Sequence, residues 1–279
     1  MNSTIAKDDM AQHSAPSSPS SLTLRMISAA VMMPVIFGAV WLGGWFFIVL
    51  TALIAGLMYW EWQGLCGERG NKANLFALFC ATGPVVLAIT GGPQTLIGWG
   101  LMTVVIFILQ KYKPREFLAI GFAYIYLACI SLVWLRGLDQ TGMETMIWLG
   151  IVVVMTDTCA YFTGRSLGGP KLAPAISPKK TWSGLIGGIV GAAVAGAILA
   201  GYIGANIVGV AVVSGVFAII AQIGDLAISK AKRMYDVKDS SNIIPGHGGV
   251  LDRFDGILAA ALAMALLTLL GGGSPLSWL

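Results

Sequence analysis

The 279 residues of this chain are 57% hydrophobic and 11% charged, whereas soluble domains are about 45–50% apolar and about 25% charged. This composition excludes an ordinary soluble fold, which could not bury so much apolar surface. The net charge of +4 comes without a basic domain rich in interleaved aromatic residues, which argues against a nucleic-acid partner. The four cysteines stand singly without metal-ligand spacing, so we interpret them as packing thiols.

Most of the chain consists of apolar blocks of about 17–25 residues, the length with which an α-helix crosses a bilayer. Residues 1–23 precede them as a serine- and proline-rich segment, for which we predict a disordered cytoplasmic tail. The fold class is therefore all-α, a polytopic integral membrane protein with about nine transmembrane helices. The predicted spans lie near residues 25–42, 45–64, 74–91, 93–110, 116–135, 144–163, 182–202, 205–229 and 254–271.

The basic residues fix an orientation for these spans. Sixteen of the 17 Lys and Arg residues lie before the first span or after an even-numbered one, and only Arg136 lies on the other side. The positive-inside rule then predicts a cytoplasmic N-terminus and a C-terminus on the far side of the membrane. Short glycine turns at 42–44 and 91–93 predict helical hairpins. In span 182–202, Gly184, Gly187, Gly188 and Gly191 predict a close helix contact.

The loop between the sixth and seventh spans collects cations and hydroxyls just before a helix begins. Its members are Arg165, Lys171, Ser177, Lys179, Lys180 and Thr181. Free backbone N–H groups and the helix dipole at such a position attract phosphate. Cytoplasmic loops are basic in any case, so this pattern taken alone also fits an ordinary connector.

Residues 222–256 carry a denser polar pattern. Helical spacing places Asp225, Ser229, Lys232 and Arg233 on one face. A turn with Pro245 and three glycines then predicts that the chain folds back, which brings Asp252 and Asp255 toward that face. Carboxylates among cations are suited to holding Mg²⁺ against phosphates, although surface salt bridges are the ordinary interpretation of mixed charge.

Two carboxylates favour a site over surface salt bridges, because they lie inside or at the inner ends of apolar spans, where charge is costly. They are Asp157 and Asp225. Asp157 also shares a predicted helix face with Tyr161, Gly164 and Arg165. The inner ends of the sixth, eighth and ninth spans are therefore expected to contribute acids to one site.

At this point the residues resemble a known family. The run Ser229-x-x-Lys232-Arg233-x4-Lys238-Asp239-x-Ser241-x2-Ile244-Pro245-x-His247-Gly248-Gly249-Val250-x-Asp252-Arg253-Phe254-Asp255 is similar to the signature of phosphatidate cytidylyltransferases, or CDP-diacylglycerol synthases. The segments 157–165, 177–182 and 25–45 resemble that family too. The likeness covers residues from about 24 to the end and is most specific over 154–256. Ala231 and Ser183 depart from the usual pattern, and Ser183 is expected to lack a polar loop contact.

The resemblance implies an enzyme of phospholipid biosynthesis that converts CTP and phosphatidate to CDP-diacylglycerol and pyrophosphate. It further implies Mg²⁺ dependence, with room for a second, monovalent cation, and a homodimer in the lipid bilayer. Residues 24–140 would be N-terminal membrane helices and 141–279 the catalytic membrane region.

The expected site residues follow from this assignment. We expect Asp225, Asp252 and Asp255 to hold the metal, and Lys232, Arg233, Lys238 and Arg253 to neutralise phosphates. His247 is expected to donate a hydrogen bond to phosphate or to fix the loop. Substrate-binding roles are expected for Asp157, Arg165, Ser177, Lys179, Lys180, Thr181, Ser229, Gly248 and Gly249.

Three other functions would explain part of this pattern. A secondary transporter also uses acids inside the membrane and glycine-broken helices, but it predicts two matching halves, whereas the polar residues here cluster in the second half. A cytidylyltransferase acting on another lipid phosphate, such as the ether-linked archaeal type, shares most of the signature. A lipid scaffold without chemistry leaves Asp225, Asp252 and Asp255 unexplained.

Overall fold

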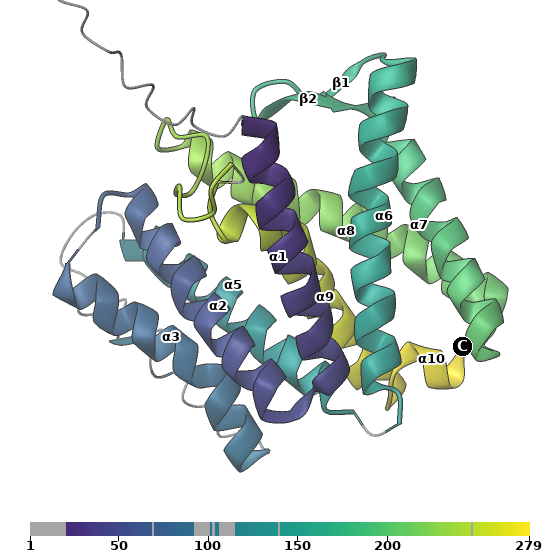
Figure 1. The fold of residues 1–279 in the computed structure, drawn as a ribbon, viewed down its shortest axis with the longest axis horizontal. Coiled ribbons are helices and arrows are strands. Elements are labelled where there is room, and N and C mark those ends of the chain that lie inside the picture. Colours follow the sequence, from purple (N-terminus) through teal and green to yellow (C-terminus); the bar gives the residue numbers. More distant parts are fainter. Residues whose placement is uncertain are drawn as a thin grey trace, which may run out of the picture.

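The computed structural model describes residues 21–68, 70–91, 101, 104–105, 115–138, 140–246 and 248–279. These form a predominantly helical protein (Figure 1). The helices are α1 (Ser21–Leu42), α2 (Gly44–Leu65), α3 (Asn71–Thr90), α5 (Arg115–Arg136), α6 (Gly142–Leu167), α7 (Trp182–Ile203), α8 (Ile207–Arg233), α9 (Leu251–Gly271) and α10 (Pro275–Trp278). Strands β1 (Lys171–Ala173) and β2 (Ser177–Thr181) pair antiparallel between α6 and α7, where the sequence predicted only a loop.

Among the described residues, six helices are long and apolar enough to cross a membrane, namely α2, α5, α6, α7, α8 and α9. Shorter apolar segments, Met26–Leu42 and Asn74–Thr90, lie within α1 and α3. Eight of the predicted spans thus correspond to described helices, while most of span 93–110 lies outside the described residues. The total of nine stays a prediction. The tail predicted for 1–23 also lies largely outside them, and α1 begins at Ser21.

The first predicted hairpin turn is confirmed between α1 and α2. Gly43 and Gly44 have φ of 62° and 51°, a left-handed region that glycine adopts without a Cβ penalty. Arg136 at the end of α5 reaches this turn, donating from Nε to the carbonyl of Val40 at 2.6 Å and from Nη2 to that of Trp41 at 3.2 Å. A cation therefore satisfies the last carbonyls of α1, at the negative end of its dipole.

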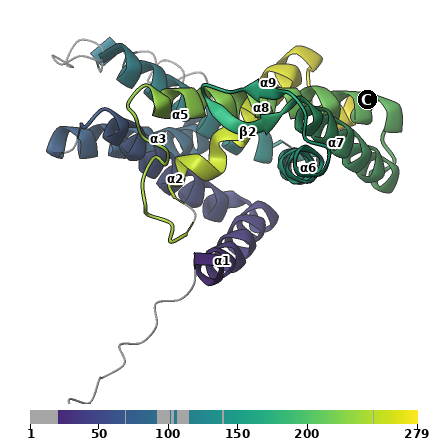
Figure 2. The same cartoon turned by 90° about the horizontal axis from the view of Figure 1, so that it is seen from above.

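The buried residues form two clusters that share α2, α5, α8 and α9. One includes Tyr59 of α2 and Phe122 of α5, and the other includes Trp148 of α6 and Phe217 of α8. Figure 2 shows α1 at the margin of the molecule, away from the other helices. Because α8 and α9 belong to both clusters, their polar ends lie between the two groups of helices.

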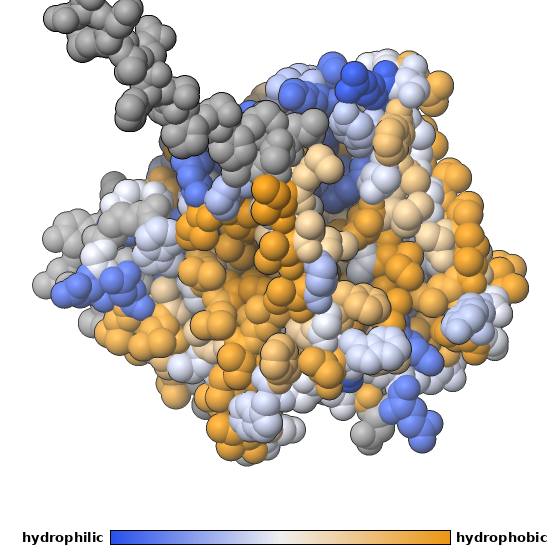
Figure 3. Space-filling view, in the orientation of Figure 1, coloured by the Kyte–Doolittle hydropathy of each residue, from blue (hydrophilic) through white to orange (hydrophobic). Residues whose placement is uncertain are grey.

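Polar and apolar surfaces are separated along the helices. The N-terminal end of α1 and the β1–β2 hairpin lie at one end of the molecule, and α10 lies at the other (Figure 1). Figure 3 shows hydrophilic residues gathered over the hairpin and hydrophobic ones over the helices below it. Along α7 the exposed side chains include Ile186, Val190, Val194 and Ile198. These apolar faces suit contact with lipid chains.

The glycine-rich face of α7 packs closely against α6, as its spacing predicted. A Cβ on Gly184 would come within 2.9 Å of the carbonyl oxygen of Ala160, and one on Gly188 within 2.9 Å of that of Thr156. Both obstacles are backbone atoms of α6, which cannot rotate away. The two helices that flank the β1–β2 hairpin are therefore held at a fixed, short separation.

We expect Gly188→Ala to lower the unfolding temperature of the detergent-purified protein by several degrees, because the added methyl separates α6 from α7 at a cost of about 1–3 kcal/mol. Gly150→Ala in α6 is the matched control, since its Cβ would meet nothing within 4 Å and alanine favours a helix. Equal unfolding temperatures for the two variants would contradict the close contact.

Candidate active site

A chain of polar contacts links α6, β2 and α8. Lys180 Nζ on β2 lies 2.5 Å from Asp225 Oδ2 on α8 and donates to Gln222 Oε1 at 2.8 Å. Gln222 Nε2 in turn donates to Asp157 Oδ1 of α6 at 3.1 Å. The hairpin thus places one lysine between an acid and an amide of the membrane helices, and this contact brings together Asp157 and Asp225, as the sequence predicted.

A pocket of about 570 Å³ opens beside this chain. Its walls include the predicted α6 face of Asp157, Tyr161, Gly164 and Arg165, which the structure confirms. Its cations are Arg165, Lys171, Lys179 and Lys180. Thr181 also lines it and caps α7, because its side chain accepts a hydrogen bond from the N–H of Gly184 at 3.1 Å. Four cations and a helix N-terminus make this pocket suited to an anion.

Contacts within the neighbouring loops hold the hairpin in place. Ser183, at one of the positions that depart from the family pattern, donates its hydroxyl to the carbonyl of Gly168. Ser183 thus makes a polar loop contact of its own, while the loss of the contact that a Glu or Gln would make here stays a prediction. Arg233 is exposed and donates to the carbonyls of Ile176 at 3.3 Å and Val237 at 3.2 Å. Its guanidinium thus joins the hairpin to the end of α8, while its predicted contact with phosphate stays a prediction.

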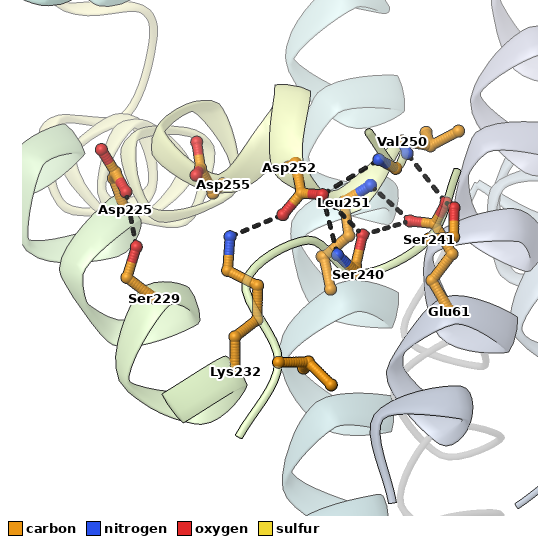
Figure 4. Close-up of polar contacts among 12 residues, drawn as sticks. Glu61, Asp225, Ser229, Lys232, Ser240, Ser241, Val250, Leu251, Asp252 and Asp255 are labelled. Carbon is orange, nitrogen blue, oxygen red and sulfur yellow. Dashed lines mark hydrogen bonds and ion pairs between the residues drawn. The ribbon is translucent and has the colours of Figure 1, made fainter. Parts of the chain in front are cut away.

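A second cluster lies where α8 meets the start of α9 (Figure 4). Lys232 Nζ is 2.6 Å from Asp252 Oδ1. Asp252 Oδ2 accepts from the N–H of Ser240 at 2.8 Å, from its hydroxyl at 3.0 Å and from the N–H of Gly249 at 2.9 Å. Lys232 and Asp252 are both buried. Four donors therefore occupy the Asp252 carboxylate, and the chain does fold back as predicted.

Asp255 lies between the two clusters, beside Asp225 (Figure 4). Ser229 donates its hydroxyl to Asp225 Oδ1 at 3.1 Å, and Asp255 Oδ1 accepts from the N–H of Gly256 at 2.8 Å. The negative charges of Asp157 and Asp225 repel that of Asp255. In the part of the chain that the structure describes, Asp255 has no ion-pair partner, whereas Asp225 and Asp252 each have a lysine.

These carboxylates bear on the expected metal. Within the described ranges, no three His, Cys, Asp or Glu side chains are arranged to hold a metal ion. Magnesium, however, is commonly bound by one or two carboxylates together with water and substrate phosphates. Asp225, which pairs with the pocket residue Lys180, and the neighbouring Asp255 supply such oxygens, so the donor set fits Mg²⁺. The oxygens of Asp252 already accept four hydrogen bonds, and a metal role for it stays a prediction.

The other predicted site residues are dispersed around the two clusters. Ser177 begins β2, and Lys238 is exposed beyond α8. Arg253 is exposed on α9, and its positive charge attracts the carboxylate of Asp157. Gly248 exchanges backbone hydrogen bonds with Ile244 at 2.9 and 3.1 Å, and Gly249 is buried beneath Ser240. His247 lies outside the described residues.

Three polar residues near the site were not among those expected from the sequence, namely Glu61, Gln222 and Ser240. Glu61 on α2 is fully buried and contacts the loop before α9 (Figure 4). One signal for it was present: a single carboxylate within the apolar block 45–64 is costly and usually marks function. Its partners, far along the chain, carried no comparable signal.

Comparison with known proteins places the chain in a family. The model of the cytidylyltransferase family matches residues 23–270. The phosphatidate cytidylyltransferase of Brucella suis is 41% identical over 257 residues, covering 90% of this chain and 94% of the relative. Those of Rickettsia felis and Bacillus subtilis are 37% identical over 194 residues (66% and 81% covered) and 40% identical over 162 (57% and 60% covered). The chain therefore belongs to the cytidylyltransferase family.

Proposed function

We propose that this protein is a phosphatidate cytidylyltransferase, which transfers the cytidylyl group of CTP to phosphatidate and releases pyrophosphate. The proposal rests above all on the pocket of about 570 Å³, in which four cations and the start of α7 lie beside Asp157 and the Lys180–Asp225 pair. Its position at the ends of apolar helices suits a reaction between a charged nucleotide and a membrane lipid. The full-length likeness to the Brucella suis enzyme supports the same lipid substrate.

The reaction needs no general base from the protein. Phosphatidate carries a phosphate monoester whose second pKa is about 6, so a nucleophilic oxygen is largely ionised at neutral pH. This oxygen attacks the α-phosphorus of CTP, and the bond to pyrophosphate breaks on the opposite side. The protein's task is then to position two anions and to neutralise their charge. Lys179 and Lys180 on β2, with Arg165 on α6, supply that charge within the pocket.

Magnesium would be held by Asp225 and Asp255. When bound, it would neutralise the pyrophosphate that leaves, as metal ions do in other phosphoryl-type transfers. Ser229 would orient the Asp225 carboxylate through its hydrogen bond, and Lys180 would keep Asp225 at the pocket edge before substrates arrive. Asp252 and Lys232 support the site from the buried side. A second, monovalent cation stays an expectation from the resemblance.

We further propose that the N-terminus and the pocket face the cytoplasm of a bacterial inner membrane. The support is the one-sided distribution of Lys and Arg in the sequence, together with the hydrophilic surface over the hairpin (Figure 3). The homodimer implied by the resemblance stays a prediction.

The function is tested by incubating the purified protein with labelled CTP, Mg²⁺ and phosphatidate in mixed micelles. The expected result is a labelled lipid that comigrates with CDP-diacylglycerol, together with pyrophosphate. Chelation of Mg²⁺ with EDTA should abolish the product, and added Mg²⁺ should restore it.

A parallel reaction with an ether-linked lipid phosphate separates the diacyl enzyme from its archaeal-type relative. We expect phosphatidate to be the better substrate by kcat/KM. Absence of labelled lipid with either phosphate, across detergents and salts, would contradict the proposed function and favour a transporter.

A further inference from the structure

Glu61 is a buried carboxylate near the site that accepts four hydrogen bonds, as many as Asp252. It has no exposed surface, although it lies on α2, in the half of the chain from which the sequence predicted no site residue. Oε1 accepts from the N–H of Val250 at 2.9 Å and the hydroxyl of Ser241 at 2.5 Å. Oε2 accepts from the N–H of Leu251 at 2.7 Å and the hydroxyl of Ser240 at 3.0 Å (Figure 4).

These contacts supply the cap that α9 lacks. The first N–H groups of a helix have no partner within it, and Val250, at the N-cap, offers no side-chain hydrogen bond. Glu61 accepts from Val250 and Leu251 in its place. A carboxylate at this end of a helix is also favoured by the helix dipole. The start of α9, which carries Asp252, is therefore fixed by a side chain of α2.

The loop before α9 is packed against the same carboxylate. A Cβ on Gly249 would lie 2.7 and 2.8 Å from the two Glu61 oxygens and 1.9 Å from Ser240 Oγ. Only glycine leaves room for Glu61 to approach the loop this closely. Ser240 extends the contact, because its hydroxyl lies 3.0 Å from both Glu61 Oε2 and Asp252 Oδ2.

Asp252 connects the anchored loop to Lys232, a cation of the site. It is bound by the N–H groups of Ser240 and Gly249, both of which belong to the loop that Glu61 holds. Its other oxygen pairs with Lys232 Nζ at 2.6 Å. The position of the Lys232 ammonium thus depends, through Asp252, on a loop that is anchored to α2.

We propose that Glu61 is a positioning residue for the proposed cytidylyl transfer: it anchors Ser240, Ser241, Val250 and Leu251 and thereby sets the position of the Asp252–Lys232 pair. This inference rests on the proposed function. It differs from a simple packing contact between α2 and α9, which would affect stability without a specific effect on turnover. Glu61 touches neither substrate, so its removal acts on kcat through the loop.

The test compares Glu61→Gln with Ser214→Ala in the intact protein. Glutamine keeps the size of the side chain but turns one acceptor into a donor that faces the N–H of Val250 or Leu251. Ser214 is a matched control near the start of α8, where its buried hydroxyl accepts from Trp148 Nε1 at 2.8 Å. Its loss also leaves a buried donor unpaired, but away from the loop.

For Glu61→Gln we expect kcat to fall about 10–100-fold, as for residues that orient a site from behind, with KM for CTP changed less than about threefold. Amide hydrogen exchange over 238–252 should rise about tenfold or more, measured without substrates. Ser214→Ala should keep kcat within about twofold and leave exchange over 238–252 unchanged. Glu61→Asp, which keeps both acceptors on a shorter side chain, should recover part of the kcat.

Two kinetic results would overturn the inference: wild-type kcat in Glu61→Gln, or equal losses of kcat in Glu61→Gln and Ser214→Ala. Failure of the proposed function looks different. In that case the wild-type protein would form no CDP-diacylglycerol, while exchange over 238–252 would still show whether Glu61 anchors the loop. Unchanged exchange in Glu61→Gln would refute the anchor whatever the reaction is.

Discussion

Replacing Asp225 by Asn is expected to lower kcat/KM by at least about 10³-fold, or about 4 kcal/mol of transition-state stabilisation. Asp225 is the acid that joins the most features of the site: it pairs with Lys180 at 2.5 Å, accepts from Ser229 at 3.1 Å and lies beside Asp255. The amide removes the charge that pairs with Lys180 and that suits a divalent cation. Side-chain size hardly changes, so the loss reflects charge.

The measurement is the initial rate of CDP-diacylglycerol formation at several Mg²⁺ concentrations. Asp236→Asn makes the same chemical change on an exposed residue just after α8, at a φ of 54° that Asn tolerates, and should keep wild-type kcat/KM. If Asp225→Asn keeps more than about a tenth of the wild-type kcat/KM at saturating Mg²⁺, the role assigned to this carboxylate is wrong.

Apolar block length was enough to predict the helices, because spanning a bilayer fixes both composition and length. The predicted spans 182–202 and 254–271 agree with α7 and α9 within three residues at either end. The β1–β2 hairpin was missed for a physical reason. Its strands have only three and five residues, and the loop between them is held by Arg233 of α8 through the carbonyl of Ile176. No local pattern reveals a strand that depends on such a contact.

The site shows the same division between local and distant contacts. Helical spacing correctly placed Asp157, Tyr161, Gly164 and Arg165 on one wall of the pocket, because residues three and four apart on a helix share a face. Spacing also predicted that Ser229 would meet Asp225. Two contacts between distant segments were not predicted. Lys180 approaches Asp225 from the hairpin, and Glu61 contacts Leu251 across 190 residues of sequence.

The predicted metal-binding acids differ in burial, a difference that the sequence did not reveal. Asp252 looked equivalent to Asp225 as a metal ligand, since both stand among cations at the ends of spans. In the structure Asp252 is buried and accepts from Lys232, Ser240 and Gly249, whereas Asp225 is partly exposed and pairs with Lys180. A carboxylate whose oxygens are all engaged stabilises a loop more readily than it binds an incoming ion.

The second large effect is expected for Lys180→Met, which should lower kcat/KM about 10²-fold. Methionine keeps the length of the side chain but removes the charge. Lys180 is the cation that contacts both Asp225 and Gln222, and it lines the pocket in which phosphates would lie. Lys230→Met removes an exposed cation from α8 and should have little effect, which separates a local role from a loss of net charge.

Combining Lys180→Met with Asp225→Asn shows whether the pair acts as a unit. Removing Lys180 alone leaves the charge of Asp225 without its partner, whereas removing both charges leaves no such imbalance. The double variant should therefore lose no more than about tenfold beyond Asp225→Asn. If the two losses multiply in full, Lys180 and Asp225 act on different steps. Their 2.5 Å contact would then exist only before substrates bind. Once substrates bind, each side chain would contact its own phosphate or ion.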